Sequence, residues 1–244
     1  MDSSNFEDFS DGDWDKSPSL SWNERDWHEF LLKKDEEVAK FRALYRDRIG
    51  KSARLDEIAS LMSWDMEDWN SIDEGENFLI FPDISNLGSD FEMINQKDVD
   101  PDSPESISQN PYTIHCHPVY IVCSGLFSDL RDSFLEILKE GSFPHSSLDL
   151  WDFGITLTRT EKEFFMAIHA LDLADFLLSI CHMKRVLANL NSLLDWQDRF
   201  RKKPFSGIEN WDKNTMVRLF DLREVCLRLI QECRKEAQSF REEE

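Results

Sequence analysis

The stretch DKNTMVRLFDLREVCLRLIQECRKEAQSF, residues 212–240, decides the fold that this sequence predicts. Apolar side chains recur in it at steps of three or four residues, which is the repeat of one side of an α-helix. These positions are Leu219, Leu222, Cys226, Leu229, Cys233, Ala237 and Phe240. The stretch therefore predicts a long last helix that begins near Asp212 and buries one side against other helices.

A second helix is expected to begin at Pro118. Proline fits the first turn of a helix, because its missing N–H would have no partner there. Apolar residues, among them Val122, Leu126 and Phe134, then follow up to Gly141, a residue that suits the end of a helix. The sides of this segment are largely apolar, so we expect it to pack against several neighbours.

Between these two segments, the pattern predicts one long central helix over about residues 160–200. Thr158 or Thr160 is positioned to cap it, after a loop around residues 151–154. Two apolar rows run along the helix, which indicates contact on more than one side. One row includes Phe164, Ile168, Leu171 and Leu178, and the other includes Phe176, Ile180, Met183, Leu187, Leu190 and Leu194.

The N-terminal part has a shorter helical pattern. Ser21 or Asn23 can cap a helix that continues to Arg48, and Gly50 fits its end. A second, short helix is expected to begin at Leu55. Together these two segments predict a helical hairpin whose apolar side faces a partner element.

These patterns divide the chain into four parts. Residues 1–20 predict a flexible acidic tail, residues 21–95 hold the acidic helical hairpin, and residues 96–111 predict an irregular linker or long loop. Residues 112–244 predict a helical bundle. The expected fold class is therefore mainly α, a C-terminal multi-helix bundle with an N-terminal hairpin. The 8 Gly and 8 Pro are too few for the many turns of a β-sandwich.

The charge of the chain restricts its partners. The formal net charge is −21, and residues 1–111 hold 28 acidic residues against 11 basic ones. Such a surface repels a phosphate backbone and anionic lipids. We therefore expect no nucleic acid and no membrane as partner, and a basic protein or peptide instead.

Cysteine usage and the chain's start predict a compartment. Five cysteines without a C-x-x-C pair, in a chain too large to need disulfides, predict reduced thiols. The acidic N-terminus lacks the basic start and apolar run of a secretory signal. The longest stretch without charged residues, 106–128, holds prolines and histidines that lipid would not tolerate. We expect a cytoplasmic protein without a transmembrane helix.

The sharpest local motif is YTIHCHP, residues 112–118. On an extended strand, His115 and His117 would face the same side. This pair resembles the His-x-His of metal hydrolases of the amidohydrolase type, and the resemblance implies a metal-dependent hydrolase as an alternative function. His169 and Asp172, one helical turn apart, are further candidate ligands.

A simpler interpretation places both histidines just before the Pro118 helix, with one of them hydrogen-bonded to the backbone. The sequence lacks the strand–helix alternation of a (β/α)₈ barrel and the Glu-x-x-His motifs of a di-iron bundle. We favour this second interpretation and expect no metal and no cofactor. Phosphate-binding glycine loops, nucleophile elbows and the HExxH motif are also missing from the sequence. We therefore favour a function other than catalysis.

The acidic segment after the hairpin is the candidate binding site. Residues 55–69 resemble the first helix and turn of a helix-turn-helix, but the helix that would read DNA is acidic. Acidic and aromatic residues together suit arginine and lysine side chains. The candidates are Trp64, Asp65, Glu67, Asp68, Trp69, Asp73 and Glu74. We expect an interaction or adaptor module that binds a basic partner, with homo-oligomers possible.

Overall fold

A computed structural model describes residues 22–64, 113–140, 147–202 and 208–242. These ranges contain helices and no strand, which confirms the mainly α prediction. The elements are α1 (Glu24–Arg48), α2 (Arg54–Leu61), the 3₁₀-helix η3 (Ile114–Cys116), α5 (Pro118–Glu140), α6 (Ser147–Asp172), α7 (Phe176–Arg201) and α8 (Ile208–Glu242). The predicted tail and linker, residues 1–20 and 96–111, lie outside the described residues.

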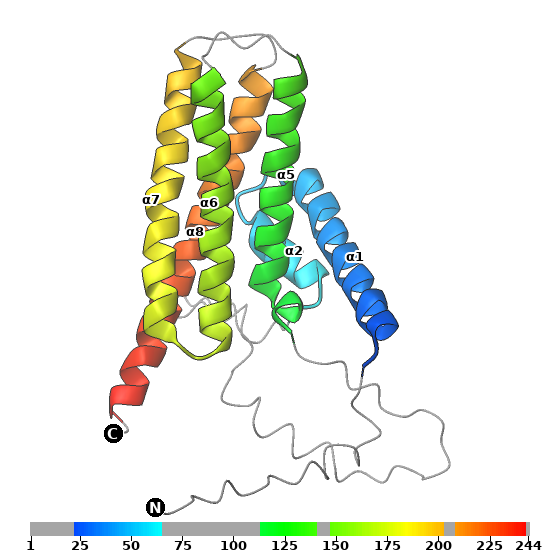
Figure 1. Cartoon of the computed structure of the whole chain (residues 1–244), viewed down its shortest axis with the longest axis vertical. Coiled ribbons are helices and arrows are strands. Elements are labelled where there is room, and N and C mark those ends of the chain that lie inside the picture. The colour runs from blue at the N-terminus through cyan, green and yellow to red at the C-terminus, as the bar shows by residue number, and fades with distance from the viewer. Residues whose placement is uncertain (1–21, 65–112, 141–146, 203–207, 243–244) are drawn as a thin grey trace, which may run out of the picture.

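The four long C-terminal helices form an antiparallel bundle. Figure 1 shows α5, α6, α7 and α8 side by side, each running opposite to the one before it. Short connections between antiparallel helices are the usual topology of such bundles. The hairpin of α1 and α2 lies against the α5 side of the bundle, and α1 packs mainly on α5.

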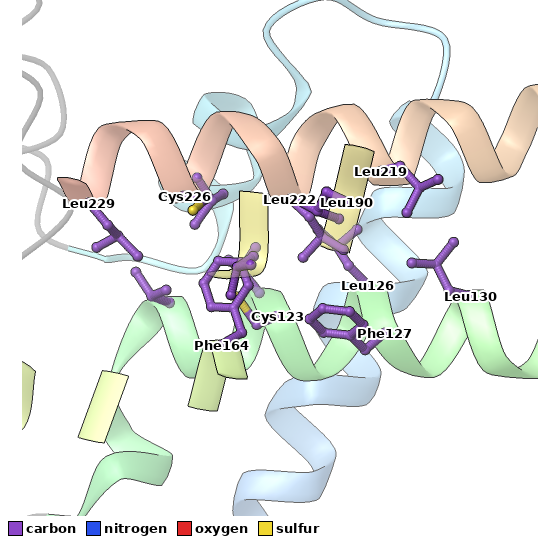
Figure 2. Packing of buried hydrophobic residues seen from close by; sticks show 14 of the residues in the cluster. Cys123, Leu126, Phe127, Leu130, Phe164, Leu190, Leu219, Leu222, Cys226 and Leu229 are labelled. Carbon is purple, nitrogen blue, oxygen red and sulfur yellow. The ribbon is translucent and has the colours of Figure 1, made fainter. Parts of the chain in front are cut away.

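The core of the bundle contains the stripe that the sequence predicts for the last helix. Figure 2 shows Leu219, Leu222, Cys226 and Leu229 of α8 pointing toward α5, and all four are buried. Between these helices lies Phe164 of α6, whose ring centroid is 6.1 Å from that of Phe127 on α5. These contacts confirm that one apolar side of α8 packs on the other helices.

The single central helix predicted over 160–200 is wrong, because the chain turns back between α6 and α7. Ala174 has a φ of 57°, in the left-handed region. Its N–H donates to the carbonyl of Leu171 over 2.9 Å, and the N–H of Asp175 donates to the carbonyl of Ala170 over 2.9 Å. This pair of hydrogen bonds is the Schellman motif that ends many helices. The predicted apolar residues up to Leu171 therefore belong to α6, and those from Phe176 onward belong to the antiparallel helix α7, where Leu178 of the first predicted row is exposed.

The predicted loop around residues 151–154 is also wrong, since these residues lie inside α6. Thr158 and Thr160 do not cap a helix. Their hydroxyls donate to the carbonyls of Gly154 and Thr156, four residues earlier, over 3.0 and 2.6 Å. Helix-interior threonines commonly satisfy their hydroxyls in this way.

The start of the hairpin agrees with the sequence pattern. Asn23 is the N-cap of α1, and its side-chain oxygen accepts the N–H groups of Arg25 and Asp26 over 2.8 and 3.2 Å. The Asp26 carboxylate accepts the N–H of Asn23 in return over 3.0 Å. This reciprocal capping box satisfies N–H groups that have no partner within the helix.

A buried carboxylate joins the hairpin to the bundle. Asp129 of α5 accepts hydrogen bonds from Arg42 and Arg46 of α1, over 2.8 and 2.7 Å, and from Arg218 of α8 over 3.2 Å. Burial raises the pKa of Asp129, but the arginine hydrogen bonds outweigh this and hold the pKa below its usual range. Asp129 is therefore charged, and it connects three helices.

A second buried carboxylate lies on α8. Asp221 accepts the hydroxyl of Tyr45 from α1 and a hydrogen bond from the Arg54 guanidinium of α2, whose Nε is 2.7 Å away. Arg228 of α8 also pairs with Asp56 of α2 over 3.2 Å. Both helices of the hairpin are thus fixed to the bundle by charged side chains.

Candidate functional site

A groove runs between α5 and α6 at the end of the bundle where α5 ends and α6 begins, and we call it the α5–α6 groove. Its volume is about 930 Å³. Leu135 and Leu138 of α5 and Trp151 and Ile155 of α6 line it, and all four are exposed. Contiguous apolar surface of this kind commonly marks a binding site. The groove is therefore the candidate functional site.

The helical repeat places one row of α6 side chains along the groove. Trp151, Ile155, Thr158 and Lys162 follow one another at steps of four, three and four residues, so they share one side of the helix. Trp151, the aromatic residue of this row, is 65% exposed. The row changes from apolar at its N-terminal end to basic at its C-terminal end.

The floor of the groove depends on a glycine inside a helix. Gly154 and Phe134 both line the groove, and a Cβ atom on Gly154 would lie 3.3 Å from Cε1 of Phe134. Phe134 in turn packs on Phe153, with 4.9 Å between the ring centroids. Because glycine costs a helix about 1 kcal/mol relative to alanine, a glycine at this position keeps space open at a cost in stability.

Positive charge lies at one end of the groove. Arg131, Arg159 and Lys162 all line it. Arg131 pairs with Glu161, whereas Arg159 and Lys162 form no salt bridge with any side chain in the described ranges. Two cations at the edge of an apolar surface are available to an anionic group on a ligand.

The acidic residue on the groove's edge is already paired. Glu163 accepts a hydrogen bond from Nδ1 of His182 over 2.7 Å and lies 3.6 Å from Arg185. The hydrogen bond from His182 lowers the pKa of Glu163. The negative charge of Glu163 is therefore matched by α7, and the end of the groove stays basic.

The two histidines of the YTIHCHP motif do not lie on a strand. His115 is in the 3₁₀-helix η3, and His117 follows it directly before α5. Nδ1 of His117 accepts the N–H of Val119 over 3.2 Å, so this ring satisfies a backbone donor at the start of α5. Burial lowers the pKa of His117 to about 4. The extended geometry that the hydrolase resemblance requires is not the geometry observed.

The other candidate ligands do not complete a metal site in the described part of the chain. His169 is exposed and Asp172 is partly exposed, both near the C-terminal end of α6. No group of three His, Cys, Asp or Glu side chains that could hold a metal ion occurs among the residues that the structure describes.

Most of the predicted acidic binding segment lies outside the described residues. This holds for Asp65, Glu67, Asp68, Trp69 and the pair at 73 and 74, because residues 65–112 are not described. Trp64 is described, and its ring is stacked on Phe41 of α1 with 6.4 Å between the centroids. Trp64 therefore packs on the hairpin.

Another buried acidic group lies on α8. Glu232 is 3% exposed, and burial raises its pKa to about 7. Two charged residues, Lys235 and Glu236, act on this pKa in opposite directions. The burial of Glu232 therefore costs the folded state least when the carboxyl group is protonated, at pH values below its pKa.

Comparison with known proteins adds no assignment. No family model matches the chain, and neither a curated protein nor a solved structure shows significant similarity to it. None of the helices in the described ranges is both long and apolar enough to cross a membrane.

The sequence reasoning missed the groove for a specific reason. It placed Trp151 and Gly154 in a loop, because glycine usually marks a turn, and so it lost the row that continues to Ile155 and Lys162. The signal was present. The residues from Leu148 onward repeat with helical spacing, as they would on an amphipathic helix that begins before the threonines.

Proposed function

We propose that this protein is a protein–protein interaction module and that the α5–α6 groove is its docking site. The observation that carries the proposal is the exposure of large apolar side chains on both walls of one groove, with Leu135 at 50% and Trp151 at 65%. Complete burial of a large apolar side chain contributes about 1.5–3 kcal/mol, and covering one that is half exposed contributes about half of that, so a partner that covers both walls gains affinity from several such contacts.

A matched pair of variants tests this proposal. Leu135→Glu places a charge in the groove, and Leu227→Glu places the same charge at a leucine of α8 with nearly equal exposure, 48%. Wild type and both variants are each immobilised on a resin and incubated with an extract of the native host. The proteins that bind are identified by mass spectrometry. A candidate is then purified, and its binding is measured by calorimetry. We expect a partner that binds wild type and Leu227→Glu but not Leu135→Glu.

The charge of the sequence supports a second contact, to a basic partner through the acidic segment of residues 65–76. This segment carries six acidic residues and no basic one, next to two tryptophans. Its attraction for cations acts at long range and is screened by salt. Reversing Glu67, Asp68, Asp73 and Glu74 to Lys should abolish such binding, and raising the salt concentration should weaken it. Binding that survives both changes would rule this contact out.

A further inference from the structure

From the shape and charge of the α5–α6 groove, we infer that it binds an acidic amphipathic helix of another protein. The inference rests on the proposed function and names the class of its partner. It differs from the basic partner expected from net charge, because the surface that the structure leaves open has the opposite sign.

The dimensions of the groove suit a helix of about three turns. Trp151 and Lys162 mark the two ends of the α6 row, eleven residues apart, which corresponds to about 16 Å along the helix axis. The α5 wall, from Arg131 to Leu138, lies opposite this row. A helix laid along both walls would continue the helix-on-helix packing of the bundle.

The apolar half of the groove selects apolar anchors on the ligand. Leu135 and Leu138 face it from α5, and Trp151 and Ile155 face it from α6. Helices that bind in grooves present anchors at positions i, i+3 or i+4, and i+7. We therefore expect two or three large apolar residues with this spacing on the partner.

The basic half fixes the direction and the charge of the ligand. Arg159 and Lys162 lie two to three turns from Trp151 along α6, and neither forms a salt bridge in the described ranges. Acidic residues on the partner, about two turns beyond its anchors, would reach them. Because the whole chain carries a net charge of −21, an acidic helix would be repelled from much of the protein's surface. The two cations Arg159 and Lys162 would therefore specify where it binds.

An open groove favours a helix over a single acyl chain. An acyl chain with a carboxylate head would also combine apolar and anionic parts. However, one chain is too thin to cover both Leu135 at 50% and Trp151 at 65% exposure on opposite walls, whereas the side chains of a helix contact both walls at once.

Selection from a peptide library identifies the ligand class directly. A displayed library of random 16-residue peptides is selected on wild-type protein, with Leu135→Glu as the counter-selection. We expect enriched peptides with apolar residues at helical spacing followed by Asp or Glu. Their binding is measured by fluorescence anisotropy, and their helicity in the complex by circular dichroism.

Charge exchange then tests the basic end. Arg159→Glu combined with Lys162→Glu should weaken an enriched peptide about 30-fold or more, while Lys184→Glu, at an exposed position of α7, should change the affinity less than about twofold. The same peptide with its acidic residues changed to Lys should bind the reversed variant better than wild type. The folded state of each variant is checked by its circular dichroism spectrum.

The following outcomes of the peptide and lipid experiments would each overturn the inference. They are no enriched peptide, enriched peptides without acidic residues, a peptide affinity that the reversal leaves unchanged, and preferential binding of a fluorescent fatty acid to the groove. Sedimentation of wild type as a dimer that Leu135→Glu dissociates would also overturn it, because a second copy of this chain would then occupy the groove. If a natural partner depends on the groove but its segment is not acidic, only the inference fails. If no partner depends on Leu135, the proposed function fails as well.

Discussion

Helix α5 has one side on the bundle and another on the hairpin, and the two sides make different contacts. Toward the bundle it presents Phe127 and Leu130, which pack on buried apolar side chains of α6 and α8. Toward α1 it presents Gly125 and Asp129, a position without a side chain and a buried charge. The bundle is thus joined mainly by apolar packing. The hairpin also packs apolar side chains such as Phe41 and Ile58 into the same buried cluster, and it adds ion pairs to Asp129.

Apolar packing and ion pairs have different roles. Apolar packing contributes much of the stability but accepts many residues of similar volume. A carboxylate that accepts from three arginines fixes one position of the hairpin, because any shift would leave a buried charge with fewer partners. We expect the bundle to supply most of the stability and the ion pairs to define where the hairpin docks.

The largest effect is expected from a core deletion in the bundle. Phe164 of α6 is fully buried against Phe127, so Phe164→Ala should lower the free energy of unfolding by about 4 kcal/mol. The measurement is urea unfolding, followed by circular dichroism. Because the lost contact is apolar, the difference from wild type should be the same at low and high salt. A strong salt dependence would contradict this view of the core.

The next largest effect tests the ion pairs of Asp129, which connect the hairpin to the bundle. Asp129→Asn removes the charge that Arg42, Arg46 and Arg218 share, and it should cost about 3 kcal/mol because three guanidinium groups lose their main partner. Asp132→Asn is the matched control, since its side chain is 57% exposed and, among the residues that the structure describes, pairs with Arg42 alone. The control should cost less than about 1 kcal/mol.

Hydrogen exchange shows where the Asp129 effect falls. If the charge holds the hairpin, exchange should accelerate in α1 and α2 more than in α6 and α7. Equal acceleration in all helices would mean that hairpin and bundle unfold as one unit, and the distinction between the two regions would then be wrong.

A smaller effect is expected where α1 crosses α5. A Cβ atom on Gly125 would lie 2.5 Å from Cδ1 of Phe41, a distance that forces the helices apart. Gly125→Ala should therefore destabilise the protein by about 2 kcal/mol, although alanine is the better helix former. Gly50→Ala is the control, because nothing lies within 4 Å of its Cβ position. A second change, Phe41→Leu, should restore part of the loss in Gly125→Ala.

The sequence allowed the helical class to be predicted but not the number of helices. The stripe on α8 was readable because each turn repeats an apolar residue. The turn at Ala174 was not, since helices usually end in this conformation at glycine and no Gly or Pro interrupts residues 172–176. A periodic pattern on both sides of an alanine therefore looked like one helix.

The ion pairs between hairpin and bundle, and the α5–α6 groove, could not be predicted from the sequence for another reason. Asp129 and Asp221 are two acidic residues among 49, and only the fold brings arginines from distant segments to them. The groove likewise depends on two helices whose side-chain rows face each other. Pairings between distant segments have no local signature, and net charge says nothing about which side chains two distant helices bring together.

As the pH falls, the contribution of His117 at the start of α5 to stability should be lost before that of the Asp129 ion pairs. Because burial lowers the pKa of His117 to about 4, the unfolded chain, with a pKa near 6.5, takes up this proton first. The stability that neutral His117 contributes is present above pH 6.5 and is lost as the pH falls toward 4. Between pH 7 and pH 5.5 the loss should be about 1 kcal/mol.

The variant His117→Asn keeps an oxygen that can accept the Val119 N–H but cannot take up a proton. Its free energy of unfolding, relative to wild type, should rise by that amount between pH 7 and pH 5.5. His28→Asn, at an exposed position of α1, is the control variant. Taking the difference from wild type cancels the opposite contribution of Glu232. A flat difference for His117→Asn would show that this ring is not buried in the neutral form.

The smallest effect comes from two helix ends, one in each region. Ser63 lies in the turn that follows α2, and its φ is 58°. Its N–H donates to the Ser60 carbonyl and the N–H of Trp64 donates to the Ala59 carbonyl, both over 3.2 Å. Ala174 has the same place after α6, with the same pattern of two hydrogen bonds. A residue with a Cβ atom costs about 1 kcal/mol in this conformation, a cost that glycine avoids.

Ser63→Gly and Ala174→Gly should therefore each stabilise the helix end by about 0.5–1 kcal/mol, whereas Ala188→Gly, at an exposed position inside α7, should destabilise by about as much. The gain at Ala174 should appear in the unfolding of the bundle by urea. The gain at Ser63 should slow hydrogen exchange in α1 and α2, and it reaches the global unfolding free energy only if the hairpin unfolds together with the bundle. Equal gains in both measurements would show that charge and apolar packing have joined the two regions into one cooperative unit.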